Sequence, residues 1–239
     1  MKSKSNQKRK TVLLSSGLAV ALLVGGYAAY DYYAGNHVEI EQVIPAAGQA
    51  SGAGGAAAAG SASVQPQQLN GTWATTDASK VYFSVTTSKE TVNFVGDKVK
   101  GEWIVDTADP SRMQGKGEVD ISSLSSGNGQ RDGHVKGDDY LQASAHPTAT
   151  FQATSFEGLP AEWKEGAVAP FKLKGKLTVR GIEKEVTFDS NALYEQGALK
   201  LSGQTVVTFA DFGMKNPHAV VLDTQNDLTV RLELVLNKQ

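Results

Sequence analysis

The chain has 239 residues and a formal net charge of −2, but its charges are unevenly distributed. Five of its 23 basic residues lie within the first ten positions, which leaves 18 basic against 25 acidic residues in the remainder. This acidic remainder argues against nucleic acid as a partner, because phosphate binding needs clustered Lys and Arg. The absence of cysteine from the sequence excludes disulfides, thiolate metal sites and a lipidated-cysteine anchor.

Residues 1–33 predict a membrane segment. A basic cluster precedes an apolar run from Thr11 to Tyr30. About 20 helical residues span a bilayer core of roughly 30 Å, and the basic flank stays on the cytoplasmic side. A cleaved signal peptide with an apolar region from Val12 to Val24 is the alternative. Both interpretations place the following domain outside the cytoplasm, as a single-pass cell-membrane protein in the first case and as a secreted protein in the second.

Residues 34–69 are predicted to form a flexible, disordered linker. The stretch from 45 to 68 consists almost wholly of Ala, Gly, Ser, Gln and Pro. Such a composition cannot bury enough apolar surface to fold. The mixed composition of a folded domain begins at residue 70, so residues 70–239 are expected to form one domain with ample length for a buried core.

The folded domain is predicted to be all β. Apolar and polar residues alternate from Phe171 to Arg180 and again from Leu228 to Leu236. With weaker alternation elsewhere, the pattern gives about eight strands joined by Gly, Asp or Asn turns. Alternation of this kind is typical of antiparallel sheets with one buried face. Such strands can close into a barrel or stack as a sandwich, and the long segments at 91–106 and 198–210 favour a coiled barrel.

The inward-facing side chains of these strands are the candidates for a binding cavity. An eight-stranded barrel is either filled by its side chains or holds one small ligand. Alternation alone does not separate a cavity-lining residue from an ordinary core residue. The candidates are Phe83, Trp103, Phe151, Phe171, Leu173, Leu177 and Phe188.

A polar stretch, Arg131-Asp132-Gly133-His134, offers a second kind of site. In one interpretation Arg131, Asp132 and His134 lie at the barrel mouth and touch a ligand head group. In the interpretation that we favour, Asp132 caps a short helix and Arg131 pairs with Asp132 or a neighbouring group. Trp163 is predicted to lie in a loop, where an exposed indole could dip into a membrane.

Residues typical of catalysis or metal binding do not occur in usable patterns. The four histidines, at positions 37, 134, 146 and 218, are scattered and lack the spacing of a metal site. No serine occupies a Gly-x-Ser-x-Gly turn, and Asp211-Phe212-Gly213 lacks the other motifs of a kinase. We therefore predict a protein that is not an enzyme and has no metal or resident cofactor.

The order and spacing of several motifs resemble the YceI-like family over essentially the whole domain, from about Trp73 to Leu236. In chain order they are Ser79-Lys80-Val81-Tyr82-Phe83, Val99-Lys100-Gly101, Val119-Asp120-Ile121, Arg131-Asp132-Gly133-His134, Asp139-Tyr140-Leu141, Pro147 with Phe151, Gly175 to Gly181, and Asp211-Phe212-Gly213. The chain departs from the family pattern at Val135, where leucine is usual, at Ala78, where histidine is frequent, and at Phe209–Ala210, where arginine is frequent.

The resemblance implies a lipocalin-like, extended antiparallel barrel whose apolar tunnel binds long amphiphiles. Polyisoprenoids, such as isoprenoid quinones or prenyl phosphates, are the ligands typical of the family. We therefore expect an extracytoplasmic lipid-binding protein that sequesters or carries such a chain and contacts the membrane through its N-terminal helix. The alternative is a filled barrel with a structural or stress-related role, which acts through partner contacts made by its loops.

Overall fold

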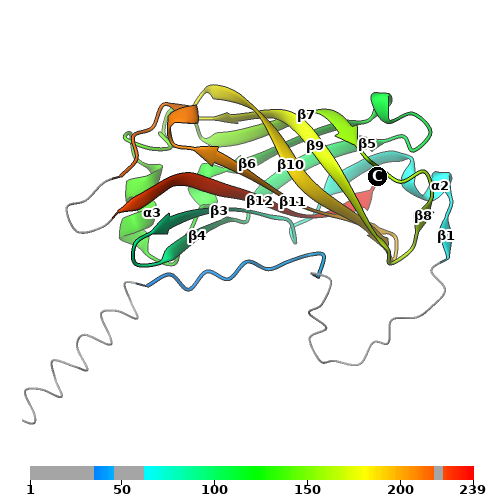
Figure 1. The fold of residues 1–239 in the computed structure, drawn as a ribbon, viewed down its shortest axis with the longest axis horizontal. Helices are drawn as coiled ribbons and strands as arrows, with labels where there is room; N and C mark the ends of the chain where they lie inside the picture. Colours follow the sequence, from blue (N-terminus) through cyan, green and yellow to red (C-terminus); the bar gives the residue numbers. More distant parts are fainter. Residues whose placement is uncertain (1–34, 46–61, 218–222) are drawn as a thin grey trace, which may run out of the picture. The chain divides into compact units, whose positions relative to one another are not determined.

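The computed structural model describes residues 35–45, 62–217 and 223–239. A single antiparallel sheet curls into a barrel (Figure 1). The strands of this sheet are β2 (Gly71–Thr75), β3 (Lys80–Thr87), β4 (Thr91–Gly96), β5 (Val99–Val105), β6 (Gln114–Asp120), β7 (Thr148–Glu157), β9 (Val168–Val179), β10 (Ile182–Glu195), β11 (Ala198–Thr208) and β12 (Thr224–Lys238).

The sheet closes around β12. This strand pairs with β11 on one side and with both β2 and β3 on the other. Because β2 also pairs with β5 and β3 pairs with β4, β2–β3 and β4–β5 each act as one interrupted strand. Together with β6, β7, β9, β10, β11 and β12 they make eight strands, so the predicted eight-stranded antiparallel barrel is confirmed.

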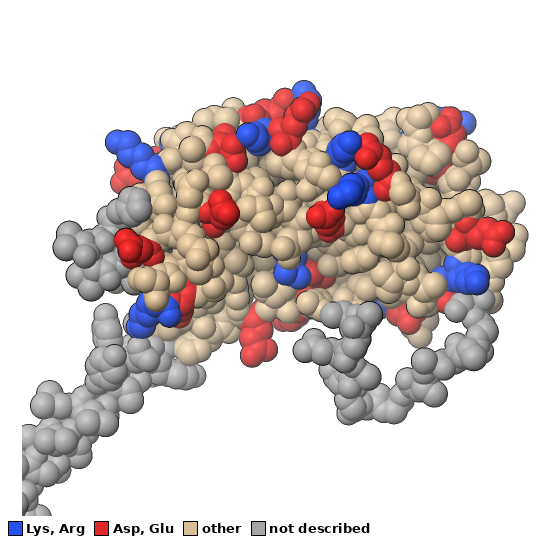
Figure 2. Space-filling model, in the orientation of Figure 1, with Lys and Arg blue, Asp and Glu red and all other residues tan. Residues whose placement is uncertain are grey.

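The alternation along β9 shows why this sequence forms a barrel wall. Leu173 and Leu177 face inward and are buried, while the intervening lysines face outward. The lysines pair with acidic residues of neighbouring strands, at N–O distances of 2.7 Å for Lys172–Asp189, 2.6 Å for Lys174–Glu157 and 2.8 Å for Lys176–Glu183. Exposed pairs of this kind contribute little stability, but each joins residues that the strand pairing brings close together on adjacent strands. Figure 2 shows acidic and basic side chains interspersed over the face in view.

Two tight hairpins connect β9 to β10 and β10 to β11. Their central residues are Arg180–Gly181, with φ of 43° and 78°, and Gln196–Gly197, with φ of 52° and 81°. Two consecutive positive φ angles are typical of the type I′ turn, whose twist matches that of antiparallel strands. The predicted glycine turns therefore set the register of these two hairpins.

One end of the barrel is closed by three short elements that come from two distant parts of the sequence. These are β1 (Ser63–Val64), α2 (Pro66–Leu69) and β8 (Trp163–Lys164). The Trp73 indole is fully buried there and donates a hydrogen bond from Nε1 to the Leu69 carbonyl at 2.7 Å. Trp163 pairs with Val64 and is buried, so its prediction as an exposed loop residue is wrong. The reason is a long-range strand pairing with a segment that had been assigned to the linker.

The other end of the barrel carries the helix α3 (Gly129–Lys136) and two 3-10 turns, η2 (Ile121–Ser123) and η3 (Ala210–Phe212). A third 3-10 turn, η1 (Pro110–Arg112), lies in the connection from β5 to β6. Figure 1 shows α3 and α2 at opposite ends of the barrel. The two ends therefore differ in character, with a packed apolar plug at one and a polar helix at the other.

Residues 38–44, which we call the strap, run along the outer wall of the barrel without regular secondary structure and bend at residues 43–44 (Figure 1, blue). Asn93 on β4 donates a hydrogen bond to the Val38 carbonyl at 2.9 Å, and the Tyr82 hydroxyl on β3 accepts one from the Glu41 N–H at 3.2 Å. Ile44 is buried. Both ends of the predicted linker therefore pack on the barrel, while its residues 46–61 lie outside the described part of the chain.

Within residues 35–45, 62–217 and 223–239, no helix is long and apolar enough to cross a membrane. The span predicted from Thr11 to Tyr30 lies outside these residues.

Candidate binding cavity

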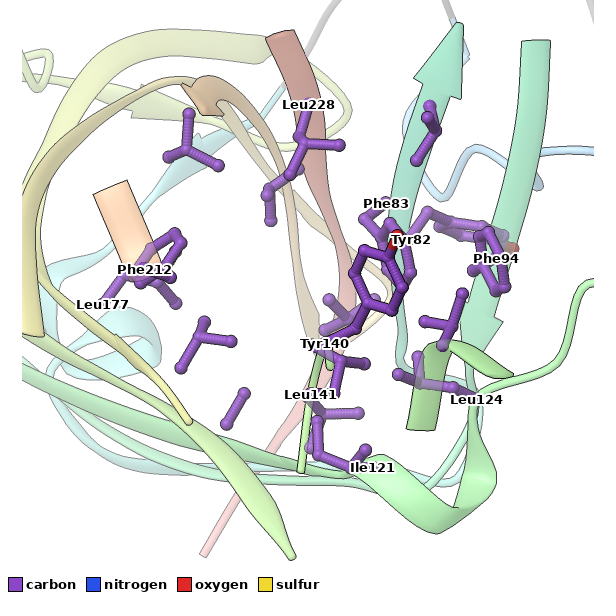
Figure 3. Close-up of a pocket in the computed structure, with 18 of the residues that line it drawn as sticks. Tyr82, Phe83, Phe94, Ile121, Leu124, Tyr140, Leu141, Leu177, Phe212 and Leu228 are labelled. Carbon is purple, nitrogen blue, oxygen red and sulfur yellow. The ribbon is translucent and has the colours of Figure 1, made fainter. Parts of the chain in front are cut away.

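A cavity of about 630 Å³ lies inside the barrel, on the side toward α3. Its volume falls within the range of roughly 300–1,000 Å³ that is usual for small-molecule pockets. Most of its wall is apolar and comes from the inward faces of the strands. Figure 3 shows side chains from strands, 3-10 turns and a loop around this space, among them Phe83, Phe94, Leu124, Tyr140, Leu141, Leu177, Phe212 and Leu228.

The sequence-predicted lining residues divide into two groups. Phe83, Trp103, Phe151, Leu177 and Phe188 line the cavity. Phe171 instead borders a separate void of about 40 Å³ nearer the closed end, and Leu173 is fully buried in the packed core. All seven face inward, but the interior is open on the α3 side and filled by side chains on the α2 side. Alternation reports only which face is buried, so it could not separate these groups.

A second set of lining residues comes from the connection between β6 and β7. Ile121, Leu124 and Leu141 form a buried cluster of their own, with Phe83 packed against it. Phe83 also stacks on Phe94, with ring centroids 4.4 Å apart. Sequence reasoning missed these residues because 3-10 and helical turns interrupt the two-residue period of the strands. The spacing of Ile121 and Leu124, three residues apart, is the only local signal for them.

Inward-facing glycines set the width of the cavity. At Gly117 on β6, which lines the cavity, an added Cβ would meet only the Lys100 carbonyl oxygen within 4 Å, at an ordinary contact distance of 3.6 Å. At Gly175 on β9, an added Cβ would overlap the ring of Phe151. Gly117 therefore leaves room for a ligand, whereas Gly175 leaves room for an aromatic side chain of the wall.

The helix α3 forms one side of the cavity mouth. Its N-cap is Asn128, whose side-chain oxygen accepts hydrogen bonds from the N–H groups of Gln130 and Arg131, each at 3.1 Å. The prediction that Asp132 caps the helix is therefore wrong, because Asn128 precedes it in the position from which a side chain reaches the free N–H groups. Arg131 and His134 of this helix line the cavity, and Asp132 does not.

Asp132 fastens α3 to the loop that precedes it. Its carboxylate accepts hydrogen bonds from the Ser126 N–H at 2.8 Å, the Ser126 hydroxyl at 2.5 Å and the Ser125 hydroxyl at 3.2 Å. Arg131 donates from Nε to the Ser126 hydroxyl at 2.8 Å and lies 3.8 Å from the Glu90 carboxylate. The predicted pairing of Arg131 with a neighbouring group is thus with Glu90 and Ser126, whose carbonyl oxygen also accepts a hydrogen bond from Nη2 at 3.3 Å.

Aromatic rings continue the mouth into the cavity. The His134 and Tyr140 rings meet edge to face with centroids 5.1 Å apart, and Tyr140 meets Phe209 at 6.5 Å. Burial raises the pKa of the Tyr140 hydroxyl above its ordinary value, with a smaller contribution from the charge of Asp139. The hydroxyl therefore stays protonated at neutral pH and can donate a hydrogen bond to a ligand.

The chemistry available at this site is that of a binding pocket with an apolar interior and a polar rim. Among the described residues, no group of three or more His, Asp or Glu side chains is placed to hold a metal ion. The side chains Arg131, His134 and Tyr140 offer hydrogen-bond donors at the rim.

Comparison with known proteins identifies the family of this barrel. A family profile described as the YceI-like domain matches residues 73–236. The chain belongs to the YceI-like family. The matched residues include every strand of the barrel, apart from the first two residues of β2 and the last two residues of β12.

Curated relatives of this YceI-like chain include a UPF0312 protein of Shewanella oneidensis, 28% identical over 121 residues, which are 48% of this chain and 60% of the relative. A UPF0312 protein of Pseudomonas aeruginosa is 27% identical over 124 residues, with 48% of this chain and 59% of the relative covered. The chain thus spans about three fifths of the length of the curated relatives that it matches.

Solved structures share the YceI-like fold. BcnA of Burkholderia cenocepacia superposes with a TM-score of 0.57 at 19% identity, over 67% of this chain and 98% of that one. A polyisoprenoid binding domain from Saccharophagus degradans also gives 0.57, at 13% identity, over 72% of this chain and 99% of that one. At these identities the likeness establishes the fold alone.

Proposed function

We propose that this YceI-like protein binds a polyisoprenoid or a similar long amphiphile, with the apolar chain in the barrel and the head group at the mouth beside α3. The cavity of about 630 Å³ inside the barrel is the observation that carries the proposal. The description of the related Saccharophagus degradans structure as a polyisoprenoid binding domain supports it.

The capacity of the cavity fits such a chain. At about 30 Å³ for each methylene-sized group, the volume of about 630 Å³ has room for on the order of 20 carbons, or about four isoprene units. Removal of these groups from water makes the free energy of binding more favourable by roughly 0.8 kcal/mol for each CH₂. The apolar wall alone can therefore provide affinity, and the ordering of the chain and the loss of its translational freedom offset part of it.

The rim suits a polar head group. Arg131 and His134 come from α3, and Tyr140 lies beside His134 with its hydroxyl protonated. An arginine guanidinium binds a phosphate or a carbonyl oxygen through several donors. A prenyl phosphate or an isoprenoid quinone could therefore bind with its head group at this rim.

We further propose an extracytoplasmic location. The basic cluster followed by the apolar run from Thr11 to Tyr30 supports a membrane anchor or a signal peptide. An anchored barrel would meet lipids at the outer surface of the cell membrane, and a cleaved form would be secreted. The mostly apolar wall of the cavity supports a binding role without catalysis.

The filled-barrel alternative has less support. It requires an interior too small for a ligand, whereas the cavity measures about 630 Å³. A role through loop contacts alone also leaves the apolar cavity without an explanation.

The experiment is lipid analysis of the full chain purified from a bacterial host. We expect an organic extract of the protein to contain a polyisoprenoid or a related amphiphile, detected by mass spectrometry. Gly117→Leu, which fills the cavity from β6, is the matched control and should carry at least tenfold less. Equal amounts of lipid on the protein and on this control, or no lipid above background after addition of prenols, would contradict the proposal.

A further inference from the structure

The barrel interior holds two separate spaces, and one side chain lies between them. Trp103 on β5 lines both the cavity of about 630 Å³ and the void of about 40 Å³. Among the described residues, it is the only one that lines both. Trp103 is 4% exposed. Trp103 is therefore the floor of the large cavity.

A change from open to filled interior also occurs along β12 and along β10. On β12, Leu234 lines the cavity and Leu236 lines only the small void. On β10, Phe188 lines the cavity and Ala192 only the small void. Toward the closed end the side chains pack together around the small void, and the Trp103 indole borders both spaces.

The neighbours of Trp103 hold the indole across the interior. An added Cβ at Gly115 on β6 would overlap the six-membered ring of Trp103, so only glycine leaves space for the ring there. On the closed side, the ring meets Phe156 edge to face, with centroids 6.2 Å apart. The indole thus lies against Gly115 on one side and Phe156 on another.

The polar atom of this side chain contributes no hydrogen bond to the fold. The Nε1 of Trp103 is buried and has no hydrogen-bond partner. An unpaired buried donor is destabilising, so a phenylalanine or leucine at this position would serve the core without that penalty. The size of the indole is what distinguishes Trp103 from such residues.

We infer that Trp103 sets the length of the apolar chain that the cavity accepts, at about four isoprene units counted from the mouth. This inference rests on the proposed function. Its structural basis is the position of one side chain between an open and a filled space. The residue acts as a stop for the end of the chain and makes the cavity selective for length.

The test is a competition between all-trans prenols. The full chain is incubated with an equimolar mixture of prenols of two to eight isoprene units, separated from free lipid, extracted and analysed by mass spectrometry. For the wild type, we expect the amount of bound prenol to rise at first, at least tenfold for each added isoprene unit. Beyond about four units the amount should level off or fall, and this length is the turning point of the profile. For Trp103→Ala, the same turning point should move upward by roughly one to two units.

Two further variants make the result specific. Trp103→Phe, which removes the unpaired N–H and keeps an aromatic ring, should fold and show a smaller shift in the same direction. Phe171→Ala, the matched control, also removes a buried aromatic side chain at the small void but leaves Trp103 in place, so its length profile should equal that of the wild type.

The outcomes separate the inference from the proposed function. If the wild type binds prenols and both Trp103 variants keep its length profile, Trp103 is not the stop and the inference is wrong. If Phe171→Ala shifts the profile as far as Trp103→Ala, general loosening of the core explains the effect and the inference is again wrong. If the wild type binds no prenol of any length, the proposed function fails and the inference fails with it.

Discussion

The Glu233 carboxylate on β12 accepts a hydrogen bond from the backbone N–H of Val43 in the strap at 2.9 Å. Glu233 points to the outside of the barrel, yet it is fully buried because the strap covers it. The Ser202 hydroxyl donates to the same carboxylate at 2.9 Å, and an Arg231 nitrogen lies 4.0 Å from it. A buried carboxylate thus joins the strap to the barrel wall.

This contact makes stability depend on pH. Burial raises the pKa of Glu233 above its ordinary value of 4.5, and the hydrogen bonds from Val43 and Ser202 only partly oppose it. A raised folded-state pKa gives a contribution to stability that is complete below the ordinary pKa and is lost as pH rises through the folded-state value. In Glu233→Gln this dependence should disappear.

The measurement is urea unfolding of both proteins between pH 4.5 and pH 8. The free energy of unfolding of the wild type relative to Glu233→Gln should fall as pH rises. The difference removes the contributions of exposed carboxylates such as Asp120, whose pKa is lowered by hydrogen bonds from Ser122 and which act in the opposite direction. A pH-independent difference would contradict the assignment.

A leucine at Gly117 should weaken ligand binding in the cavity without unfolding the barrel. Its side chain would occupy the space of about four methylene groups, so affinity for an apolar ligand should fall on the order of 100-fold. Titration with a fluorescent phenylnaphthylamine measures this change. Gly133→Leu on α3, where an added Cβ meets nothing within 4 Å, adds the same side chain outside the cavity and should bind as the wild type does.

Removal of the Asp132 carboxylate should loosen α3 at the mouth. In Asp132→Ala the Ser126 N–H and the two serine hydroxyls lose their acceptor, which should lower the free energy of unfolding by about 1–3 kcal/mol. Hydrogen exchange should become faster in residues 125–136. Asp138→Ala, at an exposed carboxylate, is the control. Unchanged exchange in the Asp132 variant would show that the helix is held by other contacts.

Alanine should have opposite effects at two glycines. Gly181 has φ of 78°, and an added Cβ would lie 2.7 Å from the His146 ring, so Gly181→Ala should lower the free energy of unfolding by at least 1–2 kcal/mol. Gly133 lies within α3 with open space around it, so Gly133→Ala should raise it by about 0.5–1 kcal/mol. Thermal unfolding measures the change in stability of each variant relative to the wild type. Changes of the same sign in the two variants would contradict the prediction.

Local patterns were sufficient to predict the barrel but not its cavity. The alternation from Phe171 to Arg180 and the glycine turn at Gly181 predicted β9 and its hairpin because both depend on neighbouring residues only. Arg131 and His134 were placed at the mouth as one of two interpretations, and the helix cap was assigned to Asp132 instead of Asn128. Both residue types are common at N-caps, so the choice depended on where the helix begins.

The sequence by itself determined the strand pattern, the turns and the resemblance to the YceI-like family, since each is written in adjacent residues or in their spacing. Only the tertiary structure decided which inward residues face open space. Leu173 and Leu177 have the same pattern on the same strand, yet one is packed core and the other cavity wall. Trp103, which lies on a strand far away in the chain, borders both the open and the filled part of this interior. Burial of Glu233 by the strap likewise depends on a contact 190 residues away in sequence.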